Sequence, residues 1–241
     1  MFTLYKKEVA DYFSSFIGYA CIGLFLLFTG LLLWVFPDTS ILGYGYADLR
    51  NFFSIVPYVL MFLVPAVTMR TIAGEKNDGT FDLLMTWPLS AWQIIMAKFA
   101  GCLSIIILAI LPTLLYYFSV YQLGNPIGNI DSGAVCGSFI GLILLSCGFI
   151  SLGLLTSILS RNVIVAFLLA AFLCYFTFIG LLSLSQMMVS GFLSNFFASL
   201  ALATHYDAIS RGVADTRDLI YFLSFNVIIL LLCKNSLGSG E

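Results

Sequence analysis

Few residues of this sequence have types and spacing that suit catalysis. The single histidine, His205, lies in no H-E-x-x-H pattern, and neither G-x-S-x-G nor the phosphate-binding G-x-x-x-x-G-K-[ST] occurs. The six cysteines show no C-x-x-C spacing and fall inside apolar stretches, so we interpret them as small buried hydrophobic residues. We therefore expect no catalytic residue, no metal site, no cofactor bound by this chain and no enzyme activity of its own.

Charged residues that suit recognition of a partner gather in residues 74–88, GEKNDGTFDLLMTWP. Asn77 or Asp78 is suited to N-cap a short helix, and Gly79 gives the turn conformational freedom before TFDLLM. Pro88 disfavours helix at the residue before it, so the element is expected to end there. The pattern predicts one short, separately capped helix between two longer ones.

This short helix is expected to have one apolar face. Phe81, Leu84 and Met85 recur at i, i+3 and i+4. Such a face suits docking into a groove of a soluble partner, and the alternative is a turn that rests on lipid headgroups. After it, Ser90 and Gln93 form an S-x-x-Q capping box that starts the next long helix.

The composition is that of an integral membrane protein. Of 241 residues, 61% are hydrophobic and only 9% charged, and the mean hydropathy is +1.06. A membrane-crossing helix needs about 20 apolar residues. Hydropathy predicts an all-α fold with six transmembrane helices near Phe16–Phe36, Phe52–Met69, Phe99–Tyr121, Ala134–Leu159, Val163–Ser185 and Leu219–Cys233. None of these segments contains an ionisable Asp, Glu, Lys, Arg or His, which disfavours a proton-driven carrier.

Lysine and arginine residues indicate the orientation, because cytoplasmic ends of spans are enriched in them. With the N-terminus inside, three fall in outer loops, namely Arg50, Arg211 and Arg217. The inner ends hold seven, namely Lys6, Lys7, Arg70, Lys76, Lys98, Arg161 and Lys234. The distribution favours a chain whose two termini both lie in the cytoplasm.

Two further segments complete the predicted domain. Residues 4–13, LYKKEVADYF, predict an N-terminal amphipathic elbow helix in the membrane interface, with a frayed terminus as the alternative. Residues 186–218 hold an apolar stretch interrupted by polar residues and Gly191, which we interpret as an outer re-entrant or interfacial hairpin before the last span. Residues 1–237 then form a single transmembrane domain, and GSGE at 238–241 looks like an added linker.

Small residues recur at the start of the fourth span. Gly133, Gly137 and Gly141 are spaced by four, which lets helix backbones approach closely. Two interpretations are open for this stripe: packing within one bundle, or an interface with another subunit.

A cluster of charged residues lies in the expected outer region before the last span. It suits contact with an outer partner, but it is also compatible with solvated loop charge in which one aspartate caps the last span. The residues of this cluster are His205, Asp207, Arg211, Asp215 and Arg217.

Residues 75–98, EKNDGTFDLLMTWPLSAWQIIMAK, resemble the signature E-[KR]-x-x-G-T-x-[DE]-x-L-x-[ST]-x-P-[IVL] of ABC-2 type transporter permeases, which have the type V exporter fold. The matching positions are Glu75, Lys76, Gly79, Thr80, Asp82, Leu84, Thr86, Pro88 and Leu89. The elbow, the six spans and the outer hairpin extend the resemblance over the whole chain. Within the family, residues 205–224, HYDAISRGVADTRDLIYFLS, are most similar to gliding-motility permeases of the GldF type.

The resemblance implies that the short helix is a coupling helix, which sits in a cleft of a cytoplasmic ABC ATPase subunit. It makes Glu75 the charged contact near that cleft and places Thr80, Phe81, Leu83 and Leu84 on the buried side. The ATPase-coupling residues that it implies are Glu75, Lys76, Asp78, Gly79, Thr80, Phe81, Asp82, Leu83 and Leu84. ATP and magnesium would bind in the partner ATPase.

The resemblance further implies a second permease-like membrane subunit with an extracytoplasmic domain, or a second copy of this chain, in a bacterial inner membrane. Membrane lipid is the other expected partner, and a net charge of −2 without a charged run suggests no nucleic acid. We expect a multi-pass permease subunit that couples ATP hydrolysis by the partner to export or to mechanical work, as in gliding motility. Two alternatives are open: a mechanotransmitting scaffold that moves no substrate, and an ATPase-independent channel or carrier.

Overall fold

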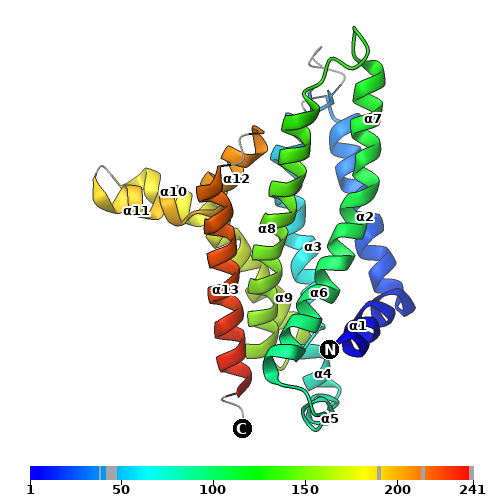
Figure 1. The fold of residues 1–241 in the computed structure, drawn as a ribbon, viewed down its shortest axis with the longest axis vertical. Coiled ribbons are helices and arrows are strands. Elements are labelled where there is room, and N and C mark those ends of the chain that lie inside the picture. The colour runs from blue at the N-terminus through cyan, green and yellow to red at the C-terminus, as the bar shows by residue number, and fades with distance from the viewer. Residues whose placement is uncertain (38, 42–47, 189–190, 213–214, 239–241) are drawn as a thin grey trace.

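The structure, a computed structural model, describes residues 1–37, 39–41, 48–188, 191–212 and 215–238. Over these residues the chain is helical and forms no β-strand, which confirms the predicted all-α fold class. The longest helices run side by side as a bundle (Figure 1). The elements are α1 (Phe2–Ser14), α2 (Phe16–Trp34), α3 (Arg50–Thr68), α4 (Ala73–Asn77), α5 (Phe81–Met85), α6 (Ala91–Ile110), η2 (Leu111–Thr113), α7 (Leu114–Leu123), α8 (Ser132–Leu159), α9 (Val163–Tyr175), η3 (Phe176–Gly180), α10 (Leu181–Met187), α11 (Phe192–Leu200), α12 (Leu202–Ser210) and α13 (Thr216–Gly238).

Five of the six predicted spans lie on helices that are long and apolar enough to cross a membrane. Five such stretches are 50–77, 91–123, 132–159, 163–187 and 216–237. A sixth arises if α1 and α2, which bend by 68° at their junction, count as one span. The second stretch contains a 3₁₀ turn, η2, at Pro112, where proline lacks the N–H that a continuous α-helix needs.

α8 lies at the centre of the bundle and packs against α3, α6, α9, α12 and α13. Within the chain, 72% of its apolar stretch is buried, compared with 22% for the stretches of α9–α10 and α13. Large apolar side chains of those two peripheral stretches therefore face outward, where lipid or another membrane subunit would cover them.

The glycine stripe on α8 packs partly within the chain. A Cβ atom added at Gly141 would lie 2.6 Å from Ile209 Cγ2 of α12, and Gly137 faces Gly212 just after that helix. These two glycines allow α12 to approach α8, which agrees with packing inside one bundle. At Gly133 the nearest neighbour is the side chain of Asp131, so this position carries no helix contact of the same kind.

A helix pair occupies the place of the predicted outer hairpin. α10 packs against α11, and Gly191, with φ of 97°, stands at the N-cap of α11. The pair projects sideways from the bundle, and α12 then returns to α8 (Figure 1). Its position relative to the bilayer stays a prediction, as does that of the elbow helix.

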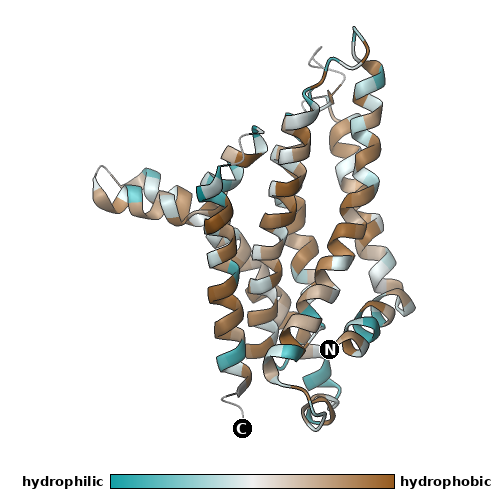
Figure 2. Cartoon of the chain, viewed as in Figure 1, coloured by the Kyte–Doolittle hydropathy of each residue, from teal (hydrophilic) through white to brown (hydrophobic). Residues whose placement is uncertain are grey.

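The start of α1 and the end of α13 lie at the same end of the bundle as α4 and α5, which we call the α5 end (Figure 1). Along the bundle axis, the helices consist mostly of apolar residues, drawn in brown, and these lie between patches of polar residues (Figure 2). Teal residues gather on α1, α4 and the neighbouring part of α6 (Figure 2). The predicted linker at 238–241 lies outside the described residues apart from Gly238.

Candidate functional site

Residues 73–88, which we call the α4–α5 segment, fold as two short helices instead of the one that was predicted. The predicted N-cap was wrong: Asp78 is the C-cap of α4, and Thr80 precedes α5 without a side-chain capping bond. Gly79 joins the two helices with φ of 71°, a conformation that favours glycine. The Thr80 N–H donates to the Glu75 carbonyl oxygen at 2.9 Å, which closes the turn. The N-cap prediction failed because the turn at Asp78 and Gly79 ends α4 before α5 begins.

The apolar face of α5 points into the chain, and its predicted docking role needs correction. Leu84 is only 5% exposed and packs with Leu4 of α1 and with Ile94 and Ala97 of α6. Met85 is half-buried beside them. Leu83, in contrast, is 65% exposed. The face formed by Leu84 and Met85 is therefore covered by the chain's own helices, and Leu83 is the leucine that remains available to a partner.

Besides the exposed residues 86–88, the segment has an outward surface formed by neighbouring residues of the inter-helix turn and one side of α5. It is short and polar around a single exposed leucine, a combination that suits a small docking contact. We call this the exposed tip, and its residues are Asn77, Asp78, Gly79, Thr80, Asp82 and Leu83.

α4 is anchored on α8 by hydrogen bonds that join residues more than 80 positions apart. The Ser157 hydroxyl oxygen accepts from the backbone N–H groups of Ile72 and Ala73 at 3.1 and 2.9 Å. It thereby satisfies donors at the start of α4 that have no partner inside the helix. The Lys76 ammonium donates to the Ile158 carbonyl oxygen and lies 5.2 Å from the centre of the Phe81 ring. Lys76 thus anchors the segment as well as carrying charge.

A buried group of charges joins the segment to α1 and α6, and we call Lys7, Glu8, Glu75 and Lys98 the Lys98 cluster. Lys98 Nζ lies 2.7 Å from Glu8 Oε1 and 2.9 Å from Glu75 Oε2, and its side chain is 0% exposed. It also donates to the Thr71 carbonyl oxygen at 2.6 Å. Lys7 Nζ lies 3.7 Å from the other Glu75 oxygen, at the exposed rim. Two acids and two bases balance, so each carboxylate of the cluster lies beside a lysine of opposite charge.

Two sequence expectations change at this cluster. Glu75, predicted as a contact for the partner, is held by the chain's own lysines. Lys98, counted among the basic residues at the inner ends of the spans, is buried inside α6. Neither Glu8 nor Lys98 was among the candidate site residues. The sequence did contain one signal for Glu8: it follows Leu4 by one helical turn, which places a lone charge on an apolar helix face.

A pocket of about 380 Å³ lies beside the cluster, between α1 and the α4–α5 segment. The residues that line it include the negatively charged Asp11 and Asp78 and the positively charged Arg70. The pocket brings exposed charges of α1 next to the exposed tip. A partner that docks on the tip would therefore also meet α1.

The charged residues predicted near the outer surface do not form one group. His205 Nδ1 lies 2.6 Å from Asp218 Oδ1, and the ring stacks on Tyr221 at 3.8 Å. This pairing ties α12 to α13. Asp215 accepts from the Arg217 backbone N–H at 3.1 Å, as expected for a residue that caps the last span.

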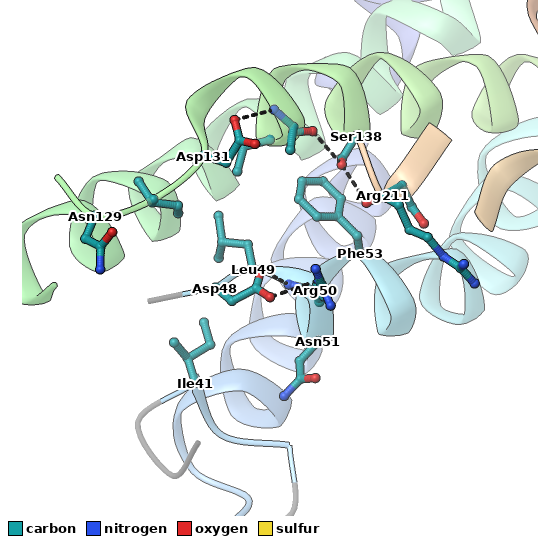
Figure 3. A pocket seen from close by; sticks show the side chains of 14 residues that line it. Ile41, Asp48, Leu49, Arg50, Asn51, Phe53, Asn129, Asp131, Ser138 and Arg211 are labelled. Carbon is teal, nitrogen blue, oxygen red and sulfur yellow. Dashed lines mark hydrogen bonds and ion pairs between the residues drawn. The ribbon is translucent and has the colours of Figure 1, made fainter. Parts of the chain in front are cut away.

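The other members of that group are exposed and separate from this pairing. The side chains of Asp207, Asp215 and Arg217 are exposed. Arg211 instead lines a pocket of about 610 Å³ at the opposite end of the bundle from α5. Figure 3 shows the walls of this pocket, with Asp131 at the N-cap of α8, Ser138 from α8 and Arg50 from the start of α3. Arg211 thus links the predicted outer group to a cavity.

Comparison with protein-family models gives a match over nearly the whole chain. Residues 3–234 match the family model described as ABC-2 family transporter protein. No curated protein matches the chain. The matched range covers nearly the whole sequence and includes the α4–α5 segment, the Lys98 cluster and the five candidate spans apart from the last three residues of the final one.

Proposed function

The chain belongs to the ABC-2 transporter family, and we propose that it couples ATP hydrolysis by a cytoplasmic partner to export or to mechanical work across the membrane. Membership makes it a multi-pass transmembrane permease subunit of an ABC transporter, in a family whose permeases work with an ATPase subunit and are not themselves catalytic. In the proposal, ATP and magnesium bind in that partner. The chain lies in a bacterial inner membrane with the α5 end in the cytoplasm.

The observation that supports coupling is that the exposed tip belongs to a segment whose other residues are anchored to the bundle. Leu83 and the turn at Gly79 face outward, while Glu75 and Lys76 are fixed to α6 and α8. Force applied to the tip would thus pass into two spans and would not be lost in a loose loop. A short helical element of this kind fits a groove on a soluble ATPase.

Two modes of action are compatible with this coupling: the complex either moves a substrate or only transmits force. The similarity of residues 205–224 to gliding-motility permeases favours mechanical work, with a second permease-like subunit or a second copy beside this chain. Reconstituted vesicles that contain the complex give the test. ATP-dependent movement of lipid or solute would support export, and ATP hydrolysis without any such movement would support the mechanotransmitting scaffold.

The docking role is tested by replacing Leu83, the exposed leucine, with serine. The tagged chain is purified from its own host, and the amount of copurifying ATPase is measured by mass spectrometry and by ATP hydrolysis. Leu83→Ser should weaken ATPase binding about tenfold, or about 1.4 kcal/mol, since it truncates the apolar centre of the contact. Membrane insertion and yield should not change, because the side chain packs little within the chain.

Leu123→Ser is the matched control, because Leu123 is 62% exposed and lies at the opposite end of the bundle. It should leave the ATPase bound. If Leu83→Ser retains the ATPase as well as Leu123→Ser does, docking through the exposed tip is wrong. If no ATPase copurifies and the purified chain alone conducts solute, the ATPase-independent channel or carrier replaces the proposal.

A further inference from the structure

Lys98 joins three elements that are far apart in the sequence. Its ammonium group makes hydrogen bonds to Glu8 of α1 and to the Thr71 carbonyl oxygen, together with an ion pair to Glu75 of α4. A lysine has three N–H donors. Two of these donors are used by Glu8 of α1 and by the Thr71 carbonyl oxygen just before α4, Glu75 is reached as an ion pair, and the side chain is 0% exposed. Water therefore cannot readily replace any of these contacts.

The approach of α1 to α6 is built around this contact. A Cβ atom added at Gly101 would lie 3.0 Å from Glu8 Cβ, so glycine gives Glu8 the space to reach Lys98. The Tyr5 hydroxyl lies 2.9 Å from Ser104 Oγ, one turn along the same face. α1 is therefore packed along α6 and is not attached to the bundle only through its junction with α2.

We propose that Lys98 is a positioning residue that joins α1 and the α4–α5 segment to α6, so that the three move as one body. Moving α1 or the segment alone would leave a buried carboxylate unpaired in apolar surroundings, which is more costly than moving all three together. The role of this joint in transmitting force rests on the proposed function. The joint itself is a property of the chain and is measurable without an ATPase.

The decisive variant is the double change Glu8→Gln and Lys98→Met. It removes one acid and one base, so that Glu75 keeps Lys7 as its partner and the charges stay balanced. The matched control is Asp11→Asn with Lys6→Met, which removes one exposed acid and one exposed base from the same helix.

Distances between spin labels test the joint in the full chain, reconstituted in lipid nanodiscs. One label is placed on α1 through Ala10→Cys and the other on α4 through Asn77→Cys, both exposed positions, in a background without the native cysteines. The labelled chain without further changes and the control variant should each give a narrow distribution of label-to-label distances. The double variant should give one that is about twice as wide, as expected for two elements that move independently. A distribution as narrow as that of the control would overturn the proposal.

A single variant covers the case in which the double variant does not fold. Glu8→Ala removes the side-chain acceptor of Lys98 on α1, leaves the Lys98–Glu75 ion pair in place and should widen the same distribution, and an unchanged width would again overturn the joint. Failure to copurify any ATPase would count against the proposed function, while the distance distributions would still decide the joint.

Discussion

Replacing Lys98 with methionine should destabilise the chain strongly, because it leaves two buried acids without their shared partner. The Glu8 and Glu75 side chains are 9% and 15% exposed, so water can compensate little of the loss. Removing one member of a buried ion pair costs about 3–5 kcal/mol. Lys7, at 3.7 Å from Glu75 and 48% exposed, offsets only a part of this cost.

Thermal unfolding of the purified chain in detergent gives the measurement. For a chain of this size, a loss of about 3–5 kcal/mol lowers the Tm by roughly 6–20 °C. The double variant Glu8→Gln with Lys98→Met should recover part of the loss, because Glu8 no longer leaves a buried charge unpaired while Glu75 keeps only Lys7. A Tm for Lys98→Met within about 2 °C of the unchanged chain would refute the burial and pairing of this lysine.

Three further variants test individual contacts. Ser157→Ala removes the acceptor for two backbone N–H groups at the start of α4 and should lower stability by about 0.5–2 kcal/mol, with faster hydrogen exchange confined to α4. Gly153→Val should lower the Tm through a cost of about 1–3 kcal/mol, because any Cβ at Gly153 overlaps the Thr68 side chain; normal stability would contradict this close approach. Tyr206→Phe removes a 2.7 Å hydrogen bond to the Phe53 carbonyl oxygen and should lower the free energy of unfolding, measured by chemical denaturation, by about 1 kcal/mol. An unchanged free energy of unfolding would mean that the hydroxyl contacts water and does not make this bond.

The spans were predictable because crossing a bilayer requires long apolar helices, and hydropathy detects these without any tertiary information. Local signals of the same kind also succeeded. Ser90 and Gln93 form the predicted capping box at the start of α6, with both of its hydrogen bonds present. Such contacts depend on residues three positions apart, and a sequence pattern therefore contains them completely.

Contacts across the bundle were not predictable in this way. Lys98 and Glu8 are separated by 90 positions, and Ser157 and Ala73 by 84. Periodicity placed Leu84 on an apolar face, but it could not show whether that face meets a partner or the chain's own α1 and α6. For the same reason, Glu75 was interpreted as a contact outside the chain when its partner lies within it.

The central claim is that the exposed tip of the α4–α5 segment contacts a cytoplasmic ATPase. A photo-crosslinking amino acid in place of Leu83, activated in living cells, tests it most directly, with the same substitution at Leu123 as the control. The predicted result is a crosslink from position 83 to an ABC ATPase subunit and none from position 123. Crosslinks from position 83 to lipid alone, with no ATPase subunit captured, would contradict the account.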